Sequence, residues 1–123
     1  TAAQEAMRRC EIDISQIKLM IPHQANRRII DAVGDRLGVK PEQVFVNVDR
    51  YGNTSSASIP IALEEAIATG RITEGMNVLL VAFGAGFTWA ASVRTLWPRT
   101  SSTDSARRKP RSMRLPTPTI RPI

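Results

Sequence analysis

A run of six apolar residues at positions 78–83 constrains the fold of this chain more than any other feature. The run reads Val78-Leu79-Leu80-Val81-Ala82-Phe83 and lacks the apolar-polar alternation of a strand with one solvated face. A strand that is apolar at every position is covered on both faces, which is typical of strands inside α/β proteins. The run therefore predicts a buried strand within an α/β sheet.

Hydrophobic periodicity predicts the elements around this strand. Gly38 is a natural stop for the second helix, and Pro60 fits only the first turn of the third helix, which Gly70 ends. After the first helix the predicted order is βαβαββ, an α/β fold with a mixed sheet and covering helices. The expected elements are a helix at 2–10, a strand at 17–21, helices at 25–37 and 56–69, and strands at 44–48, 78–83 and 87–96.

Apolar residues recur on one side of each of the two longer predicted helices, which indicates the side that packs against other parts of the protein. In the helix at 25–37 the repeat has a step of four, with Ile30 beside it. The predicted apolar sides are formed by Ala25, Ile29, Val33 and Leu37 in the first of these helices, and by Ile59, Leu63, Ala66 and Ile67 in the second.

Two polar side chains follow strand-like runs where helix-like runs begin. His23, the only histidine, follows the strand at 17–21, and Asn53 follows the strand at 44–48. Open α/β sheets bind ligands at the carboxyl ends of their strands. A neutral imidazole and an amide can each donate an N–H to one oxygen, so the pair can stabilise an oxyanion or enolate. A structural hydrogen bond is the alternative role for a lone histidine at a strand end.

Three motifs are far more specific than this pattern. They are Pro22-His23-Gln24-Ala25-Asn26, Tyr51-Gly52-Asn53-Thr54-Ser55 and Phe83-Gly84-Ala85-Gly86-Phe87-Thr88-Trp89. In amino-acid sequence, order and spacing, the three motifs closely resemble the C-terminal half of β-ketoacyl-acyl-carrier-protein synthase III. The resemblance covers about residues 1–94. The resemblance implies half of a thiolase-like fold. Because such a sheet expects a partner half, we expect it to expose a large apolar surface.

The resemblance also implies a reaction. The family condenses a short acyl-CoA, typically acetyl-CoA, with malonyl-acyl-carrier protein in type II fatty-acid synthesis. His23 and Asn53 match the residues that donate hydrogen bonds to the malonyl thioester oxygen as carbon dioxide leaves. One such donor is typically worth ~3 kcal/mol of barrier. His23 then acts as a neutral donor and not as a proton abstractor. A homodimer is implied for the complete enzyme, and no cofactor.

Two residues of the third motif match positions close to the reacting atoms. Ala85 is the middle residue of a loop whose backbone N–H binds the acyl oxyanion in the family, and small residues there let the backbone approach closely. A tight strand connection is the alternative role for this loop. Phe83 resembles the phenylalanine that packs over the active site and contributes to substrate binding, and core packing is its alternative role.

Residues of the predicted helix at 25–37 match positions that contact substrate and carrier protein. Ala25 and Asn26 correspond to the pantetheine path of CoA and carrier-protein substrates. Arg28 corresponds to a basic position associated with docking the acidic carrier protein. Arg36, two turns further along, extends this basic stripe or belongs to an ordinary solvated helix face.

The nucleophile of the family is not visible in this chain. It is a cysteine of the N-terminal half, at a helix N-terminus that lowers the pKa of the thiol. Cys10, the only cysteine, precedes His23 in a predicted peripheral helix, so we expect it to be structural or incidental. We therefore expect a fragment that carries the decarboxylation half of the site and that is inactive in condensation when isolated.

The basic character of the chain lies in its last residues. Residues 95–123 hold seven basic residues and one acidic residue, which accounts for the formal net charge of +6. A segment rich in Ser, Thr, Pro and Arg cannot bury enough surface to offset its ordering entropy. We expect a folded domain at 1–97 and a disordered basic tail at 98–123. The tail is either the product of a shifted reading frame or vector sequence, or a genuine extension that contacts an acidic carrier protein.

Composition excludes several other classes. Residues 1–94 hold ten basic and ten acidic residues, so the high isoelectric point does not indicate a nucleic-acid binder. No apolar run approaches the roughly 20 residues of a membrane helix, and no Cys/His cluster has metal-ligand spacing. The single cysteine fits a reducing compartment, and we expect a cytoplasmic enzyme, or a plastid one in a eukaryote.

Three functions remain open from the sequence. The first is a fragment of a synthase III, and the second is a related condensing enzyme that starts polyketide or alkylquinolone synthesis. The third is a non-catalytic module whose basic tail holds an acidic carrier protein.

Overall fold

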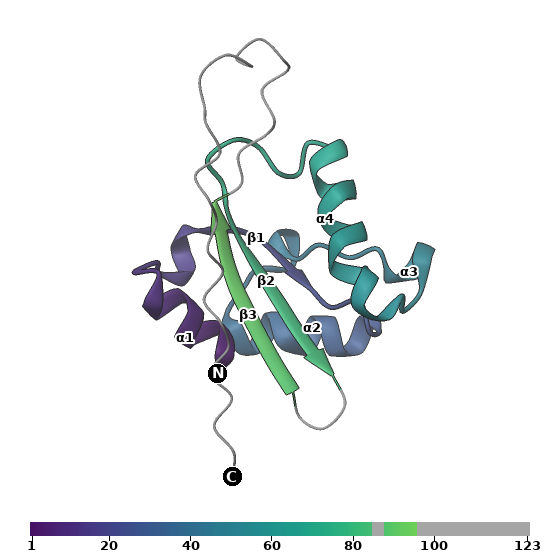
Figure 1. Ribbon diagram of the computed structural model, residues 1–123, viewed down its shortest axis with the longest axis horizontal. Helices are drawn as coiled ribbons and strands as arrows, with labels where there is room; N and C mark the ends of the chain where they lie inside the picture. Colours follow the sequence, from purple (N-terminus) through teal and green to yellow (C-terminus); the bar gives the residue numbers. More distant parts are fainter. Residues whose placement is uncertain (85–87, 96–123) are drawn as a thin grey trace, which may run out of the picture.

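The computed structural model describes residues 1–84 and 88–95, and its centre is a three-stranded mixed sheet (Figure 1). The middle strand pairs in parallel with one neighbour and antiparallel with the other. In sheet order the strands are β1 (Ile17–Pro22), β2 (Asn77–Gly84) and β3 (Thr88–Thr95). The α-helices are α1 (Ala2–Arg9), α2 (Arg27–Leu37), α3 (Val48–Tyr51) and α4 (Ser58–Ala68).

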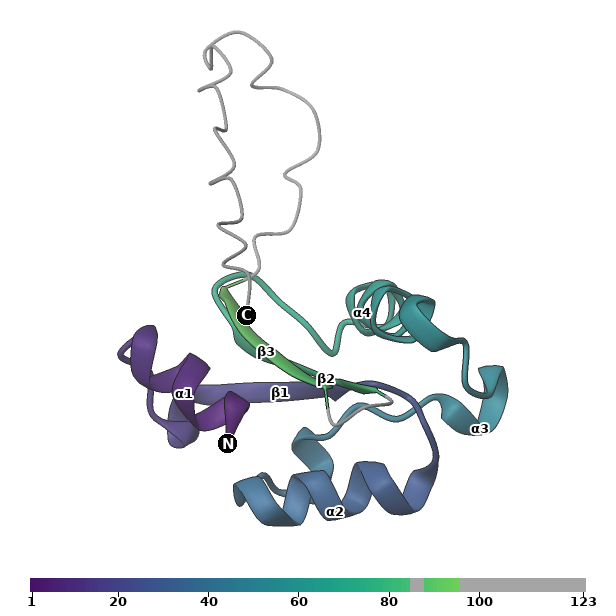
Figure 2. The ribbon, with the colours of Figure 1, turned by 60° about the horizontal axis from the view of Figure 1, so that its bottom comes forward.

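Helices lie on both sides of the sheet, with α1 and α2 on one side and α4 on the other (Figure 2). The strand β2 contributes Leu79 and Val81 to the core beneath α1 and α2. Val78 is buried in the second core, against Ala62 and Ala66 of α4. The continuous apolar run at 78–83 is thus explained, because successive side chains enter different cores. The prediction of a strand covered on both faces is confirmed.

Helix α2 packs on the sheet with most of its predicted apolar side, since Val33 and Leu37 pack against the core. Ile30 and Gly34 are buried, whereas Ile29 is 40% exposed. Gly34 permits this close approach, because a Cβ there would lie 3.2 Å from Val44 Cγ2. Helix α4 likewise buries its small residues, Ala62 and Ala66, and leaves Ile67 on the surface.

The strand predicted at 44–48 is reduced to one bridge. Val44 forms an isolated parallel bridge with Met20, and the Phe45 N–H donates to the Met20 carbonyl at 2.9 Å. The segment is too short for a longer ladder, since a 3₁₀ turn at 41–43 precedes it and α3 begins at Val48. The expectation of a regular strand there was wrong, although the chain does run beside β1.

Local capping explains where the helices begin. The Asn26 side chain accepts a hydrogen bond from the Ile29 N–H at 3.0 Å, so α2 starts at Arg27 and not at Ala25. Helix α4 starts two residues later than predicted because residues 55–57 form a 3₁₀ turn.

In α1, hydrogen bonds donated by Arg8 and Arg9 lower the pKa of the Glu5 carboxyl group to about 2.

The two neighbouring isoleucines of α2 give a matched test of this packing. Ile30→Ala should lower the free energy of unfolding of the 123-residue chain by about 2–4 kcal/mol, because it opens a cavity in a closed core. Ile29→Ala should cost less than about 1 kcal/mol, since the residue is 40% exposed and its loss opens no closed cavity. Urea denaturation followed by circular dichroism measures both changes. Equal losses for the two variants would contradict the packing described for α2.

Candidate functional site

The turn after β1 is held by the side-chain amide of Gln24, which is 1% exposed. Its Nε2 donates to the carbonyls of Pro22 at 2.9 Å and Phe45 at 3.1 Å. Its Oε1 accepts from the N–H groups of Asn47 at 2.9 Å and Val48 at 3.1 Å. One side chain therefore satisfies four backbone groups that no strand ladder satisfies. It also joins the end of β1 to the beginning of α3.

His23 extends from this turn into a cavity at the end of the sheet. Its backbone N–H donates to the Val81 carbonyl at 2.7 Å, which continues the contact between β1 and β2 by one residue. Its Nδ1 lies 2.5 Å from the Ser58 Oγ, and the Phe83 ring meets the imidazole edge to face at 5.3 Å. These contacts fix the ring and leave Nε2 without a partner among residues 1–84 and 88–95.

Asn53 lies on the loop between α3 and α4. Gly52 has a φ of +67°, so the chain turns sharply where α3 ends. The Asn53 Oδ1 accepts from the Ser55 N–H at 2.9 Å, and Ser55 itself has a φ of +55°. A non-glycine residue in this region is held there by its surroundings, and such residues cluster at functional sites. With Oδ1 occupied, the Nδ2 amide is the group that Asn53 can offer to a ligand.

A buried polar network anchors α3, which carries the chain toward Asn53. The Asn47 side chain, 1% exposed, donates from Nδ2 to the Glu65 carboxylate of α4 at 2.8 Å. Arg50 of α3 forms an ion pair with the same carboxylate. Together with Gln24, this network ties α3 to both β1 and α4. The positions of His23 and Asn53 are consequently coupled through the backbone between them.

His23 and Asn53 line one cavity of about 620 Å³. Carboxylate, lysine and arginine side chains are all missing from the described part of its wall. That wall is formed by His23, Asn53, Ser55, Ser56, Ser58, Ile59, Ala82, Phe83 and Gly84. An imidazole N–H and an amide N–H at a described wall without fixed charge can both donate to an oxygen that becomes negative during a reaction.

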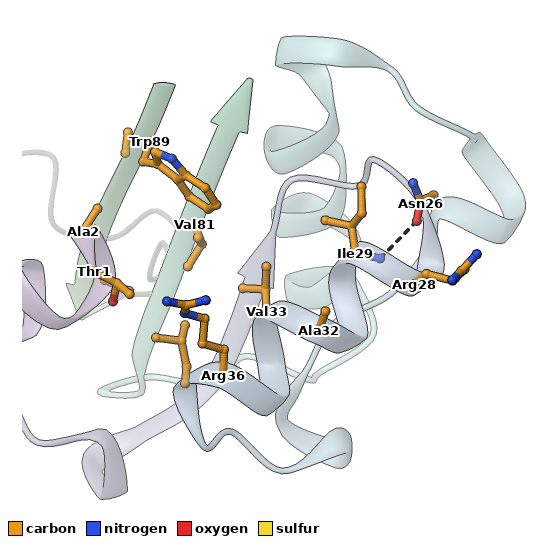
Figure 3. A pocket seen from close by; sticks show the side chains of 13 residues that line it. Thr1, Ala2, Asn26, Arg28, Ile29, Ala32, Val33, Arg36, Val81 and Trp89 are labelled. Atoms are coloured by element: carbon orange, nitrogen blue, oxygen red, sulfur yellow. Dashed lines mark hydrogen bonds between the residues drawn. The ribbon is translucent and has the colours of Figure 1, made fainter. Parts of the chain in front are cut away.

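The predicted docking residues line a second, larger groove of about 1040 Å³ (Figure 3). Arg28 and Arg36 both lie along α2 at this groove, and Asn26 lies at its end as the cap of the helix. The apolar wall includes Ile29 and Trp89, which is 58% exposed. This is the kind of exposed apolar surface that the sequence predicts for a half sheet.

Two residues predicted to bind substrate, Ala25 and Asn26, do not line the cavity that holds His23 and Asn53. Asn26 belongs to the larger groove, and Ala25 lies beside the site, where its N–H donates to the His23 carbonyl at 2.9 Å. Ala85 lies outside the described residues. Cys10 is exposed at the end of α1 and does not line the cavity.

Sequence reasoning missed the residues that hold the site in place. Gln24 lies next to His23, and a polar residue directly after a buried strand was a usable signal. Ser58, Asn47 and Glu65 gave no local signal, because their partners lie 35 and 18 residues away in the chain. Their roles depend on how α3 and α4 pack, which no spacing rule expresses.

In the part of the chain that the structure describes, no three His, Cys, Asp or Glu residues are grouped closely enough to hold a metal ion. Among the helices of that part, none combines the length and apolar character needed to cross a bilayer.

Comparison with known proteins gives a consistent result. Residues 7–96 match the family described as 3-oxoacyl-[acyl-carrier-protein (ACP)] synthase III C terminal. A β-ketoacyl-[acyl-carrier-protein] synthase III of Desulfotalea psychrophila is 60% identical over 85 residues, which cover 68% of this chain and 26% of the relative. One from Nitratidesulfovibrio vulgaris (strain DP4) is 65% identical over 77 residues, which cover 63% of this chain and 23% of the relative.

A solved structure extends this likeness to the fold. The β-ketoacyl-[acyl carrier protein] synthase III of Thermus thermophilus superposes with a TM-score of 0.74 at 59% identity. The match covers 78% of this chain and 30% of that structure. The chain thus spans less than a third of the length of these relatives. The predicted thiolase-like α/β fold is confirmed.

Replacement of Gln24 tests the hydrogen bonds that organise the site. Gln24→Leu should lower the free energy of unfolding by about 2–5 kcal/mol, because buried backbone groups lose partners worth roughly 1–3 kcal/mol each. Amide hydrogen exchange at Asn47 and Val48 should accelerate. Gln16→Leu, which removes an exposed capping hydrogen bond, should cost under about 1 kcal/mol. Unchanged protection of both amides in Gln24→Leu would contradict the role assigned to this side chain.

Proposed function

The chain belongs to the family of 3-oxoacyl-[acyl-carrier-protein] synthase III C-terminal domains, and on that premise we propose that it supplies the decarboxylation half of a condensing active site. The substrates of the complete enzyme are an acyl-CoA, typically acetyl-CoA, and malonyl-acyl-carrier protein. The complete enzyme is a cytoplasmic homodimer. The observation that carries the proposal is the cavity in which His23 and Asn53 both lie.

The reaction places a specific demand on these two residues. When the bond between the malonyl methylene carbon and its carboxylate breaks, carbon dioxide leaves and the electron pair passes to the thioester carbonyl. The resulting enolate oxygen accepts hydrogen bonds from His23 Nε2–H and from the Asn53 amide. The enolate carbon then attacks the thioester of an acylated cysteine, and the thiolate leaves. Both donors act where negative charge develops, which is where a hydrogen bond lowers the barrier.

The surroundings of His23 favour a donor over a base. In Ser-His-Asp sites, a buried carboxylate orients the histidine and stabilises its protonated form. Here a serine hydroxyl occupies that position, since Nδ1 lies 2.5 Å from Ser58 Oγ. The described cavity wall also lacks carboxylates that would repel an enolate. A neutral imidazole that donates from Nε2 is consistent with both observations.

The acyl-accepting cysteine comes from a part of the enzyme outside this chain. Cys10 is exposed at the end of α1 and is absent from the cavity wall. The relatives are more than three times as long as the segment they share with this chain. The chain by itself is therefore not competent for condensation. The backbone N–H of Ala85 contributes to the oxyanion site for the acyl thioester.

Carrier protein docks along α2 in this proposal. Arg28 and Arg36 line the larger groove, and the described residues offer Arg28 no ion-pair partner, whereas the neighbouring Arg27 pairs with Asp31 at 2.9 Å. The pantetheine arm passes Ala25, Asn26 and Phe83 on its way to His23. The catalytic domain occupies residues 1–97, in keeping with a family match that ends at residue 96, and residues 98–123 form a separate basic tail.

A chimera allows the chemistry to be measured in a complete enzyme. Residues 7–96 replace the matching segment of the Thermus thermophilus synthase, and release of carbon dioxide from malonyl-carrier protein is followed. His23→Ala and Asn53→Ala should each lower the rate by roughly 100-fold or more, the usual effect of losing one oxyanion donor. Cys10→Ser should leave the rate unchanged. Near-normal decarboxylation in both alanine variants would refute the proposal.

Charge reversal on α2 tests the docking surface in the same chimera. Arg28→Glu should raise the KM for malonyl-carrier protein roughly tenfold, because a like charge then faces the acidic carrier. Use of free acyl-CoA should change little, as CoA reaches the cavity without the carrier surface. Lys40→Glu, beyond the other end of α2, is the charge-matched control. Equal losses for carrier-bound and free substrates would show that Arg28 is structural.

A further inference from the structure

Ser58 is the first residue of α4, and its hydroxyl lies beside Nδ1 of the His23 ring. The residue is 2% exposed. Its Oγ is 2.5 Å from His23 Nδ1 and 3.3 Å from the backbone nitrogen of Gln24. Because the hydroxyl is buried between these two nitrogen atoms, the direction of its O–H bond is restricted.

The donors and acceptors around this hydroxyl determine its orientation. A backbone N–H can only donate, so Ser58 Oγ accepts from Gln24. Among residues 1–84 and 88–95, the acceptor in hydrogen-bond contact with the Ser58 proton is His23 Nδ1. If Nδ1 carried a proton, it would donate to the same oxygen, and the buried hydroxyl would lose its acceptor. Such an unpaired group costs roughly 1–3 kcal/mol, so Nδ1 is the acceptor.

We propose that Ser58 is a positioning residue that fixes His23 in the tautomer with its proton on Nε2. The hydroxyl donates to Nδ1, the single proton of the neutral ring is placed on Nε2, and that N–H is directed at the cavity. The consequence for catalysis rests on the proposed function, whereas the tautomer itself does not. Phe83 holds the same ring edge to face, so rotation of the imidazole is restricted as well.

Nuclear magnetic resonance of the imidazole nitrogens tests the tautomer directly. His23 is the only histidine of the chain, so selectively ¹⁵N-labelled full-length protein gives a single pair of ring signals. With the ring neutral, the wild type should show an unprotonated, hydrogen-bonded Nδ1 and a protonated Nε2. A proton predominantly on Nδ1 in the wild type would overturn the proposal, whatever the variants do.

Two serine variants provide the matched comparison. In Ser58→Ala the two nitrogen resonances should move toward each other as the second tautomer becomes populated. Ser58→Thr, which retains a hydroxyl, and Ser56→Ala, which lines the cavity without a hydrogen bond to His23, should keep the wild-type pattern. A wild-type pattern in a folded Ser58→Ala variant would also overturn the proposal. If Ser58→Ala does not fold, the wild type and Ser58→Thr decide the outcome.

The chimera separates this inference from the proposed function. Ser58→Ala should lower release of carbon dioxide from malonyl-carrier protein roughly tenfold, the rate equivalent of one net hydrogen bond. Ser58→Thr should recover most of that loss. If His23→Ala retains decarboxylation while the Nε2–H tautomer is observed, the proposed function fails and the role of Ser58 stands. If His23→Ala is inactive and the tautomer is Nδ1–H, the role of Ser58 fails, and decarboxylation still requires His23 but without Nε2–H as the donor in the resting site.

Discussion

The four backbone hydrogen bonds made by the buried Gln24 amide are the interaction on which the site depends. At the end of β1 the chain leaves the sheet, and the carbonyls and N–H groups there need partners inside the protein. Gln24 provides them for Pro22, Phe45, Asn47 and Val48 at once. The same amide thereby sets the turn that presents His23 and the start of the segment that leads to Asn53.

The parallel pairing of β1 with β2 explains why the site lies where it does. Because β1 and β2 run parallel, their carboxyl ends meet at one edge of the sheet, where α/β proteins bind ligands. His23 follows β1 at this edge, Phe83 lies near the end of β2, and the first turn of α4 brings Ser58 next to Nδ1 of the imidazole. The chemistry of the cavity is therefore a consequence of the layer arrangement.

The sequence predicts the buried strand and the family, but it does not predict the side-chain contacts that hold the secondary-structure elements in place. The apolar run at 78–83 predicts β2 because consecutive apolar residues by themselves indicate a buried strand. The three motifs indicate the family because their amino-acid sequences are specific to it. The prediction of a strand at 44–48 was wrong. The apolar residues of this segment have the pattern of a strand, but the N–H groups of Asn47 and Val48 donate to the Gln24 side chain and not to a neighbouring strand. The predicted apolar side of α2 is correct for Ile30, Val33 and Leu37, which are buried or pack against the core, whereas Ile29 lies partly on the surface.

The role of Ser58 could not be predicted from the sequence. It depends on a contact across 35 residues, formed only when α4 packs against the turn after β1. The positive φ of Ser55 similarly follows from the packed loop and not from its residue type. Spacing rules describe single helices and strands, and these contacts join several of them.

Binding of an enolate mimic can show whether His23 and Asn53 donate to one oxygen. A nitronate analogue of the malonyl thioester carries the charge of the enolate without reacting further. When it binds to the chimera with labelled His23 and Asn53, we expect the Nε2–H and Nδ2–H resonances both to shift downfield, because both groups donate to the same oxygen. Saturating binding that leaves either resonance unmoved would contradict a shared enolate site.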